Sequence, residues 1–177
     1  TAATAKAAMA EYERAKKLDP DRSEPYESLA ALYLQDKKTD EALRELSVAA
    51  GLDFGNDKAL AQLVDGYADK KLPKEVIKFA DQLLYIAPYR EKSRLQAAEA
   101  WLLLGQPARA LQHLNAAKLL LPDAADVDEE EQPKLQAETA RVEEVRKQLG
   151  RTKAIPFAGP ETLIDVARKK AGLPHLP

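Results

Sequence analysis

The sequence has no cysteine, and it has only seven glycines, one tryptophan and one methionine among 177 residues. Without cysteine the chain forms no disulfide, no thiolate nucleophile and no cysteine-ligated zinc site. This also leaves the cellular compartment open, because a chain without thiols tolerates either redox environment. The longest apolar runs, 101–104 and 119–121, are far too short to cross a bilayer. The formal net charge of −2 lacks the basic excess that a general nucleic-acid binder needs.

Residues that favour helices make up most of what is present. The chain is 45% hydrophobic and 32% charged, and alanine, leucine, glutamate and lysine are abundant. This composition predicts an ordered, all-α protein. Residues 1–10 contain no secretory hydrophobic segment, and they begin inside a helical pattern without an initiator methionine. We interpret the chain as a processed protein or a piece of a longer one.

A fixed interval of 34 residues separates the positions at which helices are predicted to end, namely Pro20, Phe54, Pro88 and Pro122. The same interval separates predicted helix starts after tight turns, at Thr39, Pro73 and Pro107. Small, large and aromatic residues also recur at this interval, the aromatic ones at Tyr33, Tyr67 and Trp101. Each period therefore predicts a helix, a short turn and a second helix, stacked against the next period.

In the second period the large and small residues have traded places. Val76, Ala80 and Leu83 stand where the neighbouring periods have small, large and small residues. The total volume is roughly kept, so we expect a local change of packing angle and an intact fold.

These residues resemble the tetratricopeptide repeat (TPR) family, whose signature is a 34-residue unit with small, aromatic and proline positions in this order. Three full repeats match, at 26–54, 60–88 and 94–122, and residues 8–20 resemble the second helix of a preceding unit. The subfamily is not identified. The resemblance implies a right-handed superhelical solenoid of antiparallel helix pairs.

The predicted organisation follows from these periods. An array over 1–150 would contain a half repeat, three repeats and a capping helix, at 1–22, 23–56, 57–90, 91–124 and 133–149. The remainder, 151–177, reads as an extended linker followed by a short helix at 160–172, which is not stable alone in water and is expected to dock on the array or on a neighbouring molecule.

The resemblance also implies where a partner binds, because the first helices of TPR units line the concave face. We expect the partner-binding groove to be formed by the following side chains: Glu27, Leu34, Lys58, Gln62, Asp65, Asp69, Lys92, Leu95, Gln96 and Glu99. Such a groove typically receives an extended peptide or a helix.

One TPR subfamily clamps the C-terminal carboxylate of heat-shock chaperones with lysines and asparagines at set inner positions. This chain offers Glu27 and Ala31 where lysine and asparagine are needed, Gln62 for a second asparagine, and Gln96 for a basic residue. Only Lys92 matches. Carboxylate capture of that kind needs concentrated positive charge, so the sequence argues against it.

Catalytic and metal sites are not predicted, and neither is a cofactor. His113 has no second histidine or cysteine nearby, and His175 lies in the terminal tail. Trp101 occupies the aromatic position of its unit, which predicts a core residue. No phosphate-binding glycine loop or hydrolase motif is present.

Three functional hypotheses remain open. The first is a non-catalytic protein-interaction scaffold that binds a protein or peptide in the groove, with no nucleic acid and no membrane span. The second is an accessory or regulatory domain of a larger protein, which could be an enzyme. The third is a self-assembly module in which residues 160–172 dock on the array of the same chain or a neighbouring one.

Overall fold

The structure is a computed structural model that describes residues 2–122 and 126–151. Within these ranges it contains eight α-helices and no strand, so the predicted all-α class is confirmed. The linker and the helix predicted at 160–172, together with its docking, lie outside the described residues.

The helices repeat the 34-residue interval of the sequence. The second helices of the three units begin at Thr39, Pro73 and Pro107 and end at Leu52, Ile86 and Leu120. The full order is α1 Ala2–Leu18, α2 Glu24–Gln35, α3 Thr39–Leu52, α4 Asp57–Asp69, α5 Pro73–Ile86, α6 Glu91–Leu103, α7 Pro107–Leu120 and α8 Gln132–Arg151. The predicted helix at 133–149 therefore corresponds to α8.

The turn inside each unit has one backbone conformation. Lys37, Lys71 and Gly105 occupy the same position and have φ angles of 59°, 55° and 69°. This left-handed residue reverses the chain after the first helix, and the next backbone N–H then donates to a carbonyl five residues back. The three bonds measure 2.8–3.0 Å and join Lys38 to Tyr33, Leu72 to Tyr67 and Gln106 to Trp101.

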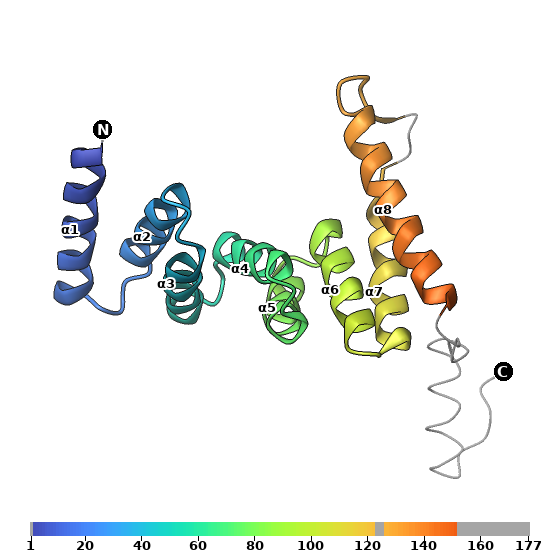
Figure 1. The fold of residues 1–177 in the computed structure, drawn as a ribbon, viewed down its shortest axis with the longest axis horizontal. Helices are drawn as coiled ribbons and strands as arrows, with labels where there is room; N and C mark the ends of the chain where they lie inside the picture. The colour runs from blue at the N-terminus through green and yellow to red at the C-terminus, as the bar shows by residue number, and fades with distance from the viewer. Residues whose placement is uncertain (1, 123–125, 152–177) are drawn as a thin grey trace, which may run out of the picture.

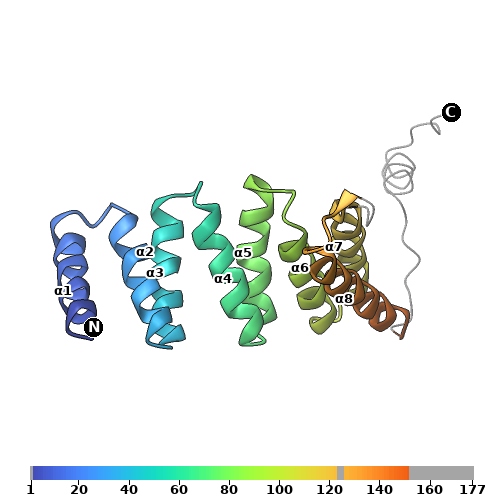
Figure 2. The ribbon, with the colours of Figure 1, turned by 90° about the horizontal axis from the view of Figure 1, so that it is seen from above.

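The helices form a single row in which three pairs are stacked between α1 and α8, as Figures 1 and 2 show. The pairs α2–α3, α4–α5 and α6–α7 each pack internally, and α3–α4 and α5–α6 join one pair to the next. One apolar core runs from α2 to α6, and a second lies among α6, α7 and α8. The structure is therefore a solenoid of antiparallel helix pairs, closed at its C-terminal side by α8, as predicted.

Buried positions also follow the repeat. Nine side chains in α3, α5 and α7 are at most 2% exposed, in three rows of equivalent residues: Ala42, Val76, Ala110; Leu46, Ala80, Leu114; Ala49, Leu83, Ala117. The exchange of large and small residues in the second unit thus keeps the core closed. Trp101 is half-buried and contacts both cores, with the Arg109 guanidinium 4.4 Å from the centre of its ring.

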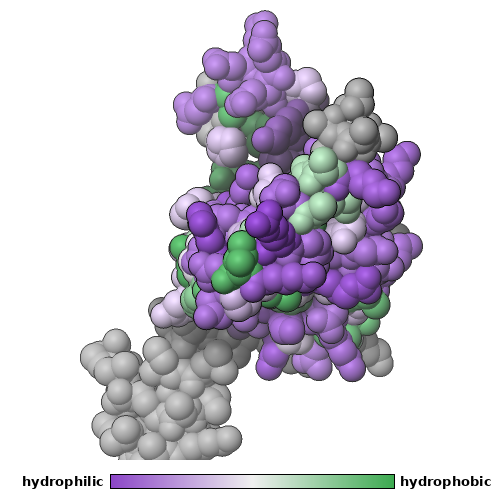
Figure 3. Space-filling model, turned by 90° about the vertical axis from the view of Figure 1, so that its left-hand side faces the viewer, coloured by the Kyte–Doolittle hydropathy of each residue, from purple (hydrophilic) through white to green (hydrophobic). Residues whose placement is uncertain are grey.

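The first helix, α1, closes the other side of the array. Its outward residues include Lys6, Glu11, Arg14 and Lys17, all exposed. Figure 3 views this side of the molecule and shows a mainly hydrophilic surface with small apolar areas. A polar outer side is what the terminal unit of a solenoid needs.

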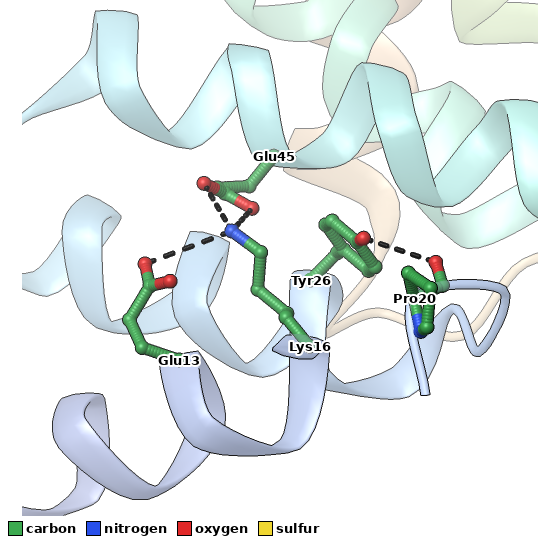
Figure 4. Close-up of polar contacts among 5 residues, drawn as sticks. All are labelled: Glu13, Lys16, Pro20, Tyr26 and Glu45. Carbon is green, nitrogen blue, oxygen red and sulfur yellow. Dashed lines mark hydrogen bonds and ion pairs between the residues drawn. The ribbon is translucent and has the colours of Figure 1, made fainter. Parts of the chain in front are cut away.

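A partly buried ion pair holds α1 to the first full unit (Figure 4). Lys16 Nζ donates to both carboxylate oxygens of Glu45, at 2.9 and 2.8 Å, and both side chains are only 17% exposed. The same ammonium lies 4.7 Å from the centre of the Tyr26 ring, whose hydroxyl donates to the Pro20 carbonyl at 3.0 Å. Burial is the largest single effect on Lys16 and lowers its pKa, but the hydrogen bond to Glu45 and the attraction of the Glu45 and Glu13 carboxylates together outweigh it, so the pKa is raised.

Removing the Glu45 carboxylate should loosen α1. In Glu45→Ala the Lys16 ammonium keeps its partial burial but loses both of its hydrogen bonds and retains only the more distant Glu13 carboxylate, at 3.6 Å on the same helix. We therefore expect the free energy of unfolding to fall by about 1–3 kcal/mol. Amide hydrogen exchange should accelerate in α1 more than in α5. The raised pKa means that this contribution is present below the ordinary lysine pKa and is lost as the pH rises through the folded value.

The control is the double variant Lys16→Met, Glu45→Leu, which replaces the pair with apolar groups and should lie within about 1 kcal/mol of the natural protein. Equal protection of α1 in Glu45→Ala and the natural chain would show that the pair does not anchor this helix.

Candidate functional site

The first helices of the units lie on the inner, concave side of the row. α4 packs against α6, and α6 packs against α8, whereas no comparable contact joins α3 to α5 or α5 to α7. Helices that approach one another across whole units lie on the shorter side of a curved array. The inner face is therefore formed by α2, α4, α6 and α8, and α8 takes the place that the first helix of a further unit would have.

Polar side chains join successive inner helices. Asp65 of α4 accepts hydrogen bonds from Lys92 Nζ and Gln96 Nε2 of α6, both at 2.8 Å. Glu99 of α6 accepts two from the Arg141 guanidinium of α8, at 2.9 and 2.7 Å. The bond to Glu99 also raises the pKa of Arg141 above its ordinary value.

Two further contacts lie at the N-terminal ends of these helices. Asn56 Nδ2 donates to Glu27 at 2.7 Å, and the Asn56 side-chain oxygen caps α4 by accepting from the Ala59 N–H at 2.9 Å. The guanidinium of Arg90 pairs with the carboxylate of Asp57. Each pair fixes the spacing between neighbouring inner helices.

Five of the ten predicted groove residues therefore hold the array together in this structure. Glu27, Asp65, Lys92, Gln96 and Glu99 all bind side chains of a neighbouring helix. Gln96 is also only 5% exposed.

Leu95 belongs to the core and not to an open groove. It is 4% exposed and packs with Val142 and Val145, because α8 lies over the inner face of α6. A cavity of about 130 Å³ remains beside it, lined by Leu95, Ala117, Leu121 and Val142 with charged side chains at its rim. The prediction that Leu95 faces a partner thus needs correction, since the sequence does not reveal which helix α8 covers.

The four other predicted residues, Leu34, Lys58, Gln62 and Asp69, lie on α2 and α4. Leu34 is 40% exposed, Lys58 and Asp69 are exposed, and Gln62 is half-buried. Within the described part of the chain none of the four takes part in an ion pair or a side-chain hydrogen bond. The accessible part of the predicted groove is thus the face of α2 and α4, which we call the α2–α4 face.

Sequence reasoning missed Asn56, Asp57, Arg90 and Arg141, which all bridge inner helices. The charges of Arg90 and Asp57 are visible in the sequence, but their partners lie about one repeat away, and only the stacking geometry selects them. Arg141 lies on the predicted capping helix, and nothing in its local pattern points to Glu99.

No group of three or more histidine or acidic side chains among the described residues is placed to hold a metal ion. His113 is half-buried on α7, and burial lowers its pKa below the ordinary value, with a smaller opposite effect of Asp81. None of the helices in the described ranges combines the length and apolarity that a membrane crossing requires.

Comparison with solved structures identifies similar folds. Two crystal structures of MamA, a tetratricopeptide repeat protein, match this chain. The first has a TM-score of 0.56 at 13% identity, with 93% of this chain and 89% of that chain covered. The second has a TM-score of 0.59 at 14% identity, with 100% and 91% covered. At such identities the likeness shows the fold, which is TPR-like.

Comparison at the level of sequence gives nothing further. No protein-family profile matches the chain, and no curated protein does.

Truncating Leu95 tests whether α8 covers α6. In Leu95→Ala we expect the free energy of unfolding to fall by about 2–4 kcal/mol, because a buried side chain is removed from the core beneath α8. Hydrogen exchange should accelerate in α8 and α6, while α2 and α3 stay protected. Leu34→Ala, at an exposed position, should change stability by less than about 0.5 kcal/mol. Equal effects of the two substitutions would mean that Leu95 is as accessible as Leu34.

The half-buried imidazole of His113 should make stability depend on pH. Its pKa is lowered in the folded state, so the unfolded chain binds a proton first as the pH falls through about 6.5. The free energy of unfolding should decrease between about pH 7.5 and 5.5. In His113→Phe, which copies the equivalent Phe79, this slope should be smaller, whereas His175→Gln should keep it. An unchanged slope in His113→Phe would refute this assignment.

Proposed function

We propose that this chain is a non-catalytic protein-interaction module of the TPR family, which binds an extended peptide or a helix on the α2–α4 face. The observation that carries the proposal is the contrast along the inner face. On α6 the groove residues contact α4 and α8. Among the described residues, in contrast, Leu34, Lys58, Gln62 and Asp69 on α2 and α4 make no ion pair and no side-chain hydrogen bond. The TPR-like fold supports a binding role, since solenoids use their concave surfaces for recognition.

The chemistry of the α2–α4 face suits a polar peptide with an apolar anchor. Leu34 offers an apolar contact, Lys58 and Gln62 offer donors, and Asp69 offers an acceptor. α2 and α4 run in the same direction, because one complete antiparallel pair separates their starting points. Lys58 and Gln62 therefore lie toward one end of the face, and Leu34 and Asp69 lie toward the other.

Preorganisation is the proposed mechanism of binding. The donors and acceptors sit on helices whose spacing is fixed by the Glu27–Asn56 contact and by the cores beneath. The array then loses little conformational freedom on binding, and the partner bears most of the ordering cost. An extended partner would form hydrogen bonds to this face through its main chain and its side chains.

A triple variant of the α2–α4 face tests the proposal. We expect Leu34→Ser, Lys58→Glu, Gln62→Ala to weaken capture of partners about tenfold or more, while the melting temperature changes little, because all three side chains are at least partly exposed. Partners would be identified by mass spectrometry after affinity capture with the 177-residue chain.

The matched control changes the outer surface instead, with Val48→Ser, Lys78→Glu and Gln112→Ala. These positions lie on α3, α5 and α7 and are exposed. Recovery of every wild-type partner by the inner-face variant would refute the proposal, as would equal losses in both variants.

A further inference from the structure

The inner face contains one arrangement that is complete between α4 and α6 and incomplete between α2 and α4. In the complete copy a single carboxylate, that of Asp65, accepts from Lys92 Nζ and Gln96 Nε2, which lie one turn apart on α6. Both distances are 2.8 Å. The next pair of inner helices has an equivalent bridge, in which the Glu99 carboxylate of α6 accepts from Arg141 of α8 at 2.7 Å.

Moving back by one 34-residue period gives the incomplete copy. Lys58 and Gln62 of α4 are the equivalents of Lys92 and Gln96, so both donor types are retained with the same spacing. The carboxylate position, however, is Ala31 on α2, where Asp65 and Glu99 stand in the following units. Ala31 is exposed, and neither Lys58 nor Gln62 has a partner among the described residues.

The carboxylates nearest in sequence do not fill the gap. Glu27, one turn before Ala31, accepts from Asn56 at 2.7 Å, and Asp57, directly before Lys58, pairs with Arg90. Asp65, one turn after Gln62, is bound by Lys92 and Gln96. α2 and α4 also approach each other less closely than α4 and α6 do, which agrees with the absence of a carboxylate bridge at Ala31.

We propose that the place above Ala31 binds a carboxylate of the partner, held by Lys58 and Gln62 as Asp65 is held by Lys92 and Gln96. This inference rests on the proposed function, since it names the chemistry that the α2–α4 face recognises. A lysine and a side-chain amide together form charge-assisted hydrogen bonds, which are stronger than those of neutral pairs. The occupant is an aspartate or glutamate side chain of an extended peptide.

Leu34 adds a second element of recognition. It follows Ala31 by one helical turn, so it lies on the same side of α2, and it is 40% exposed. The expected ligand therefore carries an apolar side chain next to its acidic one.

The chain itself supplies an informative variant. Ala31→Asp places a carboxylate where the neighbouring units have one, so it should bind Lys58 and Gln62 from within and occupy the site. Ala137→Asp, on the exposed side of α8, is the matched control because it adds the same charge elsewhere.

The probes are two blocked tripeptides, acetyl-Ala-Asp-Leu-amide and its asparagine counterpart, titrated into isotope-labelled 177-residue protein at low ionic strength and followed by NMR. The aspartate peptide should shift the side-chain amide signals of Gln62, and the asparagine peptide should bind about tenfold more weakly. Ala31→Asp should abolish the response, and Ala137→Asp should keep it. A third probe with its only carboxylate at the C-terminus tells a terminal carboxylate from a side-chain one.

Equal responses to the aspartate and asparagine peptides would overturn the inference, and so would an undiminished response in Ala31→Asp. If Ala31→Asp is not folded by circular dichroism, Gln62→Leu replaces it, and loss of the preference for aspartate is then expected. The proposed function fails separately, through the capture experiment. An Ala31→Asp protein that captures all partners, when the triple variant of the α2–α4 face captures none, would leave the groove intact and reject the carboxylate site.

Discussion

Burial between neighbouring helices is the interaction on which this structure depends. No helix here could hide its apolar side alone, and the described helices stack side by side around two cores and not around a single centre. Instead, α2 to α6 share one continuous core, and α6, α7 and α8 share another. Both ends of the row must then present polar surface, as α1 and α8 do. The inner face also results from this stacking, because it places α2, α4, α6 and α8 next to one another. The local sequence of each helix does not show which residues of the neighbouring helix it will contact.

Much of the fold could be predicted from the sequence, because a constant interval is a strong signal. Prolines at 73 and 107 give the helix starts directly, and the alanine and leucine rows give the buried sides. The candidate site was less predictable. Position within the repeat assigns Leu95 and Leu34 equally to the inner face, but one is covered by α8 and the other is open. Coverage depends on where α8 lies, and its acidic approach at 126–131 carries no periodic signal.

The inner face divides into a structural part and an accessible part. Carboxylates on α4 and α6 are neutralised by cations of the next helix, so their role is to set the spacing of the array. Such exposed ion pairs contribute little stability each, but their repetition at one position fixes the register of neighbouring units. Where the carboxylate is replaced by Ala31, the spacing rests on the Glu27–Asn56 bond and on the core, and polar groups become available to a partner. The residue at position 31 and its equivalents, Asp65 and Glu99, therefore decides whether two inner helices are bridged by an ion pair or leave their polar groups accessible to a partner.

The turns at Lys37, Lys71 and Gly105 help to explain how this chain shares a fold with solved structures to which it is only 13% and 14% identical. Their shape comes from main-chain hydrogen bonds and a left-handed residue, and lysine is accepted there as well as glycine. The residue types at these turns can therefore vary during evolution without changing the backbone conformation. The length of the turn is constrained, because an inserted residue would break the hydrogen bond that spans five residues there. An insertion inside a helix would rotate the residues after it by about 100° and turn their apolar side away from the core. Evolution of such a protein should proceed by substitution and by gain or loss of whole units.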